Sequence, residues 1–156
     1  MKNLQFKQLL LLSDTQKKAN QFLFQKRFNL ITADDNSVGK STLAKLLLWT
    51  FGCEPDFDST WKSTDCKCLV DFSIDGTNYK ILRYQNFISL KEENKEILNY
   101  TNIGGDYSKK FAELVDFKVL LPKRGSNETE LITPPPAYYF LPFYMDQKNS
   151  WSKTWN

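Results

Sequence analysis

Gly39, Lys40 and Ser41 follow one another in the chain and have the clearest chemical potential of its residues. A glycine, a lysine and a hydroxyl residue in this order end the phosphate loop G-x-x-x-x-G-K-[ST], also called Walker A. In such a loop, main-chain N–H groups surround phosphate oxygens at the start of a helix, the lysine contacts the outer phosphates, and the hydroxyl binds Mg²⁺. The triplet therefore predicts a site for ATP and Mg²⁺.

The complete loop spans residues 34–41, and Asp34 stands where the pattern has its first glycine. Asp34 and Asp35 bring two carboxylates close to the predicted phosphates, which they would repel unless they face away or meet Mg²⁺. Aspartate reaches left-handed backbone conformations more readily than most residues, so Asp34 can supply the turn that glycine normally makes. The predicted nucleotide-binding residues are Asn36, Ser37, Val38, Gly39, Lys40, Ser41 and Thr42, with Ser41 on Mg²⁺.

The elements around this loop have the order that the motif requires. Residues 28–32 form a short apolar run typical of a central buried strand, and residues 40–51 are apolar nearly all round, which predicts an enclosed helix. Gly52 provides the end of that helix. Residues 4–12 and 21–25 also have strand-like patterns, so the chain is expected to place the loop between a strand and a helix.

Residues 66–91 predict an antiparallel meander. Apolar residues alternate from 68 to 74, residues 75–76 form an Asp-Gly hairpin turn, and strand patterns return at 77–84 and 87–90. Arg83, near the end of the second of these strands, is interpreted as a strand-edge charge rather than a ligand. The meander is expected to attach to the strand, loop and helix unit.

The C-terminal third is less regular. Residues 106–117 predict a short helix, and residues 122–133 predict an exposed polar loop. Residues 137–156 are rich in aromatic side chains, which need a covering surface. Trp151 and Trp155 would share a face of a helix that the chain does not complete, so we expect the sequence to be a fragment of a longer protein.

Composition restricts the function classes. The chain has 156 residues and a formal charge of +3, which fits a single domain and gives no strong basic footprint. It has no histidine, which excludes histidine-based triads and Cys/His zinc sites within it. The cysteines number three, which favours reduced thiols and a cytoplasmic location. Lys7 and a run of prolines interrupt the apolar stretches, so we expect no membrane segment.

Together these patterns resemble the N-terminal lobe of an SMC-like or RecF/RecN-like ABC ATPase head. The resemblance covers residues 4–90 and is strongest from residue 28 to residue 43, where an apolar strand leads into Gly39-Lys40-Ser41-Thr42. It implies an α/β fold of the P-loop NTPase class carrying an antiparallel β meander. It also implies a single partial ATPase lobe over residues 1–156, with residues 1–52 holding the loop and first helix, 66–91 the meander and 137–156 an aromatic segment.

Tyr144-Met145-Asp146-Gln147 resembles the Q-loop of that family. The resemblance implies that Gln147 contacts Mg²⁺ and the attacking water, whereas the alternative is an ordinary surface glutamine. The family's signature motif, Walker B strand and switch histidine are missing from the chain. A Walker B strand at residues 143–146 is rejected, because Pro142 interrupts the strand and Asp146 is followed by Gln147 rather than by a second carboxylate. ATP hydrolysis is therefore expected only in a complete head.

The resemblance implies a second ATPase head or a C-terminal lobe as partner, with dimers in the full protein. DNA is a further implied partner, because the related proteins act in DNA repair, chromosome maintenance and anti-phage defence. Two alternatives stay open: a non-hydrolysing interaction module with a degenerate phosphate loop, and direct DNA binding through Lys123 and Arg124.

Overall fold

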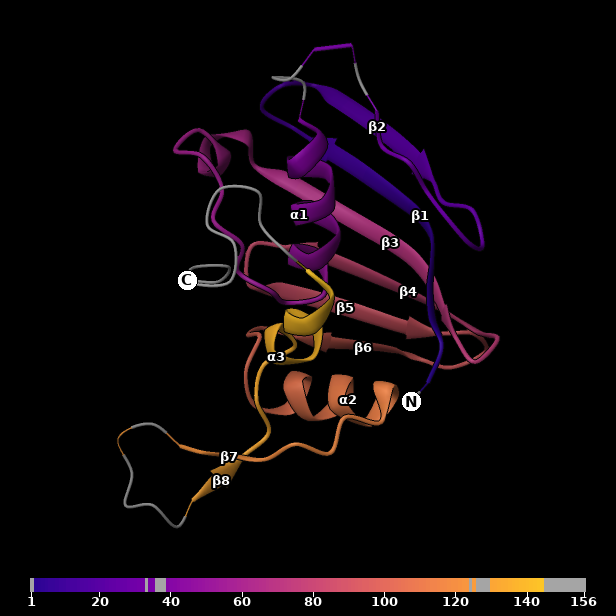
Figure 1. Ribbon diagram of the computed structural model, residues 1–156. Coiled ribbons are helices and arrows are strands. Elements are labelled where there is room, and N and C mark those ends of the chain that lie inside the picture. Colours follow the sequence, from indigo (N-terminus) through magenta and orange to yellow (C-terminus); the bar gives the residue numbers. More distant parts are fainter. Residues whose placement is uncertain (1, 33, 36–38, 124, 126–129, 145–156) are drawn as a thin grey trace.

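The computed structural model describes residues 2–32, 34–35, 39–123, 125 and 130–144. Its main element is a six-stranded antiparallel sheet in the order β2-β1-β3-β4-β5-β6 (Figure 1). The strands are β1 (Leu4–Ser13), β2 (Lys18–Leu23), β3 (Cys66–Ile74), β4 (Thr77–Tyr84), β5 (Phe87–Glu92) and β6 (Ile97–Tyr100).

The helices lie on one face of this sheet (Figure 1). They are α1 (Lys40–Thr50), α2 (Asp106–Val115) and α3 (Ala137–Phe140). Two short 3-10 helices accompany them: η1 (Trp61–Thr64) lies between α1 and β3, and η2 (Leu141–Phe143) follows α3. A two-stranded hairpin, β7 (Leu121–Pro122) with β8 (Leu131–Ile132), projects away from the sheet (Figure 1). In the described part of the chain, no helix is long and apolar enough to cross a membrane.

The strand register explains why one sheet face is covered. Leu9 pairs with Val70, and Val70 pairs with Ile81, so buried side chains from three neighbouring strands lie in one row. Because side chains alternate along a strand, the next row on each strand points to the other face, where Leu10 pairs with Leu69. The covered row belongs to the same core cluster as Phe51. The Phe51 ring meets the ring of Phe72, from β3, edge-on, with the two ring centroids 4.8 Å apart.

The end of α1 is held by neighbouring elements. Gly52 adopts a left-handed conformation (φ +93°) directly after the C-cap residue Phe51. A Cβ at Gly52 would lie 2.9 Å from Ile103 Cγ2 and 3.0 Å from Tyr107 Cε1, so only glycine fits there. The buried Tyr107 hydroxyl donates a hydrogen bond to the Phe51 carbonyl at 2.8 Å. The helix end is therefore fixed against α2 as well as against the sheet.

The predicted α/β fold of the P-loop NTPase class is wrong for this chain. The sheet is antiparallel throughout, and residues 28–32, expected as a central buried strand, belong to no strand. Phe28 is 92% exposed and Leu30 is 88% exposed. A central parallel strand needs hydrogen-bonded neighbours on both sides, but the inner strands β1, β3, β4 and β5 already have two partners each, so no central place is left for residues 28–32.

Local patterns predicted several elements correctly. The strand predicted at residues 4–12 is β1, and the helix predicted at residues 40–51 is α1. The helix predicted at residues 106–117 is α2, which ends two residues earlier, at Val115. The stretch at residues 122–133, expected as an exposed loop, contains Pro122 of β7 and all of β8, which pair with each other as a short hairpin. The strand expected at residues 21–25 begins earlier, at Lys18.

Candidate functional site

The predicted phosphate site lies at the start of α1. Gly39 is the N-cap residue and has a left-handed conformation (φ 82°, ψ 17°), which glycine adopts without a steric penalty. The first intrahelical hydrogen bond runs from the Leu43 N–H to the Gly39 carbonyl at 3.0 Å. No side chain caps this helix end in the described structure, and its first turn holds no acidic residue. The N–H groups of Lys40, Ser41 and Thr42 precede that bond, so they have no carbonyl partner within the helix.

Lys40 bends back over the loop that leads into the helix. Its Nζ donates a hydrogen bond to the Asp35 carbonyl at 2.9 Å, which places the ammonium group beside the main chain of the preceding loop. Asp34, Asp35 and Ser41 are exposed, and Thr42 is half-buried. The structure therefore brings the lysine, the N–H groups of the first helix turn and the Ser41 hydroxyl to one exposed end of the molecule.

Some predicted site residues lie outside the described residues. Asn36, Ser37 and Val38 fall in the undescribed middle of the loop. Gln147, the predicted Mg²⁺ and water sensor, also lies outside the described part, which stops at Tyr144. The described half of the predicted site is therefore Gly39 to Thr42.

A small cavity of about 230 Å³ lies beside the first turn of α1, with Thr42 in its wall. The β1–β2 hairpin contributes Lys18 and Asn20, and the segment after α1 contributes Phe57 and Trp61. This cavity combines a basic group, an amide and aromatic rings. No pattern in the sequence predicts this cavity, because its lining residues come from separate segments of the chain and belong to no motif.

Arg83 is the clearest residue that the sequence reading misjudged. It is only 1% exposed, so it is not a strand-edge charge. Its Nη1 donates to the carbonyl oxygens of Trp49 and Cys53, and its Nε donates to the Gln85 carbonyl at 2.8 Å. Its Nη2 forms an ion pair with Glu54. The guanidinium thus satisfies carbonyls at the C-terminal end of α1, where the helix dipole favours a cation.

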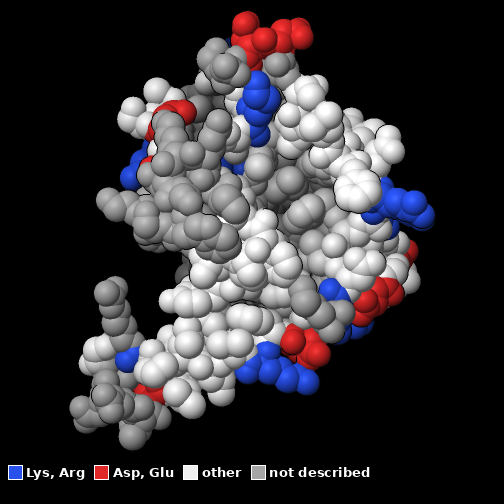
Figure 2. Space-filling model, in the orientation of Figure 1, with Lys and Arg blue, Asp and Glu red and all other residues white. Residues whose placement is uncertain are grey.

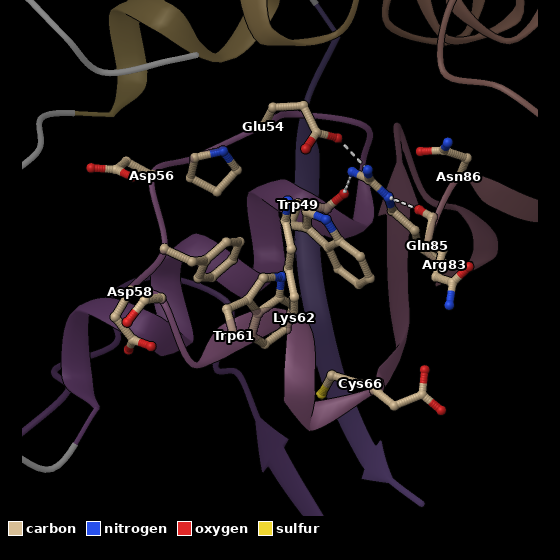
Figure 3. A pocket seen from close by; sticks show the side chains of 14 residues that line it. Trp49, Glu54, Asp56, Asp58, Trp61, Lys62, Cys66, Arg83, Gln85 and Asn86 are labelled. Carbon is tan, nitrogen blue, oxygen red and sulfur yellow. Dashed lines mark hydrogen bonds and ion pairs between the residues drawn. The ribbon is translucent and has the colours of Figure 1, made fainter. Parts of the chain in front are cut away.

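A larger cavity of about 770 Å³ surrounds this arginine at the opposite end of α1 from the predicted phosphate site. Figure 3 shows Trp49 and Trp61 side by side at its centre, with the ion pair of Arg83 and Glu54 above them. The cavity is also lined by carboxylates from the segment that follows α1, which makes it chemically unlike a phosphate site.

The cysteines are free in the structure. Burial raises the pKa of the Cys53 thiol, and the nearby Arg83 charge opposes this effect only in part. A hydrogen bond between Cys66 and Cys68 lowers the pKa of Cys66 and raises that of Cys68. Among the described residues, no group of at least three His, Cys, Asp or Glu side chains could hold a metal ion. These thiols are therefore interpreted as packing residues.

Charge is dispersed over the face that carries the helices. Figure 2 shows acidic and basic groups of both signs around the rim of this view, with uncharged surface between them. No continuous basic patch is visible on the described part of this face, in agreement with the modest net charge of +3.

No model of a known protein family matches the chain. The chain is similar to the Lamassu protein LmuB of Bacillus cereus (strain VD014), with 24% identity over 152 residues, which cover 97% of this chain and 26% of that protein. It is also similar to the Lamassu protein LmuB of Bacillus sp. (strain NCIM 5461 / CCTCC AB 2011126 / NIO-1130), with 27% identity over 136 residues, 86% of this chain and 23% of that protein. The chain thus resembles a part of two LmuB proteins and spans about a quarter of their length.

Proposed function

We propose that this chain serves anti-phage defence as the nucleotide-binding part of an LmuB-like protein, in which the start of α1 holds the phosphates of ATP together with Mg²⁺. The similarity to two Lamassu LmuB proteins supports the defence role. The free thiols of Cys53, Cys66 and Cys68 fit a reducing cytoplasm. The nucleotide role depends on the residues at the start of α1.

One observation carries the nucleotide proposal: α1 begins directly after a left-handed glycine, with three N–H groups that lack intrahelical partners and a lysine folded back beside them. Such a helix start favours an anion through both hydrogen bonds and the helix dipole. In this proposal Lys40 contacts the outer phosphates and Ser41 contributes its hydroxyl to Mg²⁺. Asn36, Ser37 and Val38 complete the cradle, with Thr42 nearby.

The cavity beside Thr42 is the proposed place of the nucleoside. It adjoins the same helix turn, and its volume of about 230 Å³ suits a base rather than a whole nucleotide. The rings of Phe57 and Trp61 offer apolar contacts, and Lys18 and Asn20 offer polar ones. The phosphates would then extend from this cavity toward Gly39 and Lys40.

A partner is part of the proposal, because the chain spans about a quarter of its relatives and leaves apolar side chains uncovered. Phe28 and Leu30, next to the phosphate loop, are almost fully exposed. Large apolar side chains grouped in this way mark a contact surface. We place there the remainder of a longer protein or a second ATPase subunit, which would also supply the groups for hydrolysis, with Gln147 as the sensor on this side. DNA is the proposed substrate of the assembled protein.

The alternative is an interaction module whose phosphate loop no longer binds nucleotide. The exposed carboxylates of Asp34 and Asp35 in the loop favour it, because they add negative charge where phosphates would lie. The exposed Phe28 and Leu30 fit it equally well. Nucleotide binding separates the two proposals.

The decisive experiment titrates the chain into a fluorescent ATP analogue with Mg²⁺ and follows anisotropy. We expect saturable binding by the wild type and a loss of at least about tenfold in Lys40→Ala, since one charged hydrogen bond is worth about 1.5–3 kcal/mol. Lys109→Ala is the matched control, because Lys109 lies in the first turn of α2 and is likewise a lysine at a helix start. Equal affinities of the wild type and Lys40→Ala would refute the proposal.

A further inference from the structure

The cavity around Arg83 lies at the C-terminal end of α1 and is formed by three parts of the chain; it shares the rings of Phe57 and Trp61 with the cavity proposed for the nucleoside. Trp49 comes from the C-terminal end of α1, and residues 54–66 follow it around one side. Gln85 and Asn86, in the turn between β4 and β5, close the other side. Its volume of about 770 Å³ is large enough to admit a side chain of another molecule.

Aromatic rings form the wall of this cavity. The Phe57 and Trp61 rings are stacked, with centroids 4.2 Å apart and an interplanar angle of 15°. The Trp49 ring meets Trp61 edge-on at 5.4 Å. Trp61 and Phe57 are only half-buried, so part of their surface faces the cavity. A wall of this kind attracts a cation through the negative faces of the rings.

Carboxylates surround the aromatic wall. Glu54, Asp56, Asp58 and Asp65 line the cavity, and Lys62 is its one lysine among the described residues. Arg83 adds no attraction for an anion, because its guanidinium is buried and already donates to carbonyls and to Glu54. The cavity is thus acidic in a chain whose formal net charge is +3.

Arg83 itself shows which ligand chemistry suits this environment. Its guanidinium lies 4.3 Å from the centroid of the Trp49 ring and pairs with Glu54, so an aromatic face and a carboxylate hold one cation together. Trp61 lines the same cavity as Asp56 and Asp58, which come from the segment just before it, so an aromatic face and carboxylates are again available to one cation (Figure 3).

We propose that this cavity is a docking site for a basic segment of a partner protein, which inserts an arginine or lysine side chain against Trp61 and Phe57 among the surrounding carboxylates. Charge complementarity selects the partner: a nucleic acid or an acidic peptide would meet carboxylates, whereas a guanidinium gains both ring and carboxylate contacts. The proposal does not rest on the phosphate loop, because Lys40 lies outside this cavity. Nucleotide is left out of the test, because Phe57 and Trp61 also line the cavity proposed for the nucleoside.

The test uses a fluorescein-labelled peptide of alternating glycine and arginine, with anisotropy measured near physiological salt. We expect saturable binding by the wild type and no binding of a glycine-glutamate peptide. Trp61→Leu and Asp56→Asn should each weaken binding roughly fivefold, which corresponds to the loss of one partly desolvated cation contact. Lys40→Ala should bind the peptide as the wild type does, which separates this proposal from that on the phosphate loop.

Glu96→Gln is the matched control, because it removes one exposed carboxylate just before β6, whereas the cavity lies at the start of β5. It should leave the affinity unchanged. Equal weakening by Glu96→Gln and Asp56→Asn would show general charge attraction and overturn the proposal, as would absence of saturable binding by the wild type. If Trp61→Leu fails to fold, the exposed Asp56 still decides the outcome.

Discussion

The Arg83 guanidinium lies over the Trp49 ring, 4.3 Å from its centroid, and donates a hydrogen bond to the carbonyl oxygen of the same residue. Arg83 comes from β4 and Trp49 from the last turn of α1, so one side chain joins the sheet to the helix. The other end of that helix carries Gly39 and Lys40. The sheet therefore fixes the direction in which the start of α1 points.

Arg83→Met should lower the free energy of unfolding by about 2–4 kcal/mol, because the buried Trp49 and Cys53 carbonyls lose their side-chain donor. Denaturant unfolding followed by circular dichroism measures this change. Lys91→Met, on the neighbouring strand β5 but exposed, should change it by less than about 0.5 kcal/mol. Equal effects of the two substitutions would contradict the role given to Arg83.

Gly52→Ala should destabilise the fold by about 2–4 kcal/mol, since the new methyl group would meet Ile103 and Tyr107 in addition to the left-handed backbone strain. Gly76→Ala is the matched control: its φ of +90° is similar, but no atom lies within 4 Å of the added Cβ. It should cost only the backbone strain of about 1–2 kcal/mol. Thermal unfolding of both variants tests the difference, and equal melting temperatures would contradict the close packing at Gly52.

Asp34→Gly distinguishes a weak phosphate loop from one that does not bind. If the loop binds ATP, removing an exposed carboxylate and restoring the glycine of the motif should tighten binding roughly three- to tenfold. The measurement is anisotropy of the fluorescent ATP analogue with Mg²⁺. No binding by either the wild type or Asp34→Gly would favour the interaction module instead.

The double substitution Phe28→Ser and Leu30→Ser should leave folding stability nearly unchanged, because both side chains are almost fully exposed. It should reduce binding of a hydrophobic dye and self-association of the isolated chain in sedimentation experiments. Ile97→Ser, at the opposite edge strand β6, removes another exposed apolar side chain and serves as control. A large loss of stability in the double variant would show that these residues pack within the chain.

The buried Cys53 thiol should make stability depend on pH in the alkaline range. Burial raises its pKa in the folded state above the ordinary value of 9.0, so the folded state keeps the proton while the unfolded state releases it. Its stabilising contribution is therefore complete below pH 9.0 and is lost progressively as the pH rises above it, by about 1.4 kcal/mol per pH unit. Cys53→Ala should flatten the alkaline decline measured by denaturant unfolding at several pH values. An unchanged slope would contradict the raised pKa.

The strands β3 and β4 and the helix α1 could be predicted from the sequence, because the apolar pattern that marks each of them lies within its own segment. Alternating apolar residues define β3 and β4, and the continuous apolar run after Lys40 defines α1. The start of α1 at Lys40 follows from the Gly39-Lys40-Ser41 triplet. The sequence by itself therefore determines that Gly39 precedes α1 and that Lys40 and Ser41 lie in its first turn.

The sheet arrangement and the second cavity were decided only by tertiary structure. An apolar run such as residues 28–32 predicts a buried strand, but burial needs neighbours, and β1 pairs with β2 and β3 instead. Arg83 reads as a strand-edge charge because nothing in its own segment shows that carbonyls from Trp49 and Cys53 will face it. Contacts between residues about thirty positions apart depend on how α1 packs across the sheet, and no local pattern contains that information.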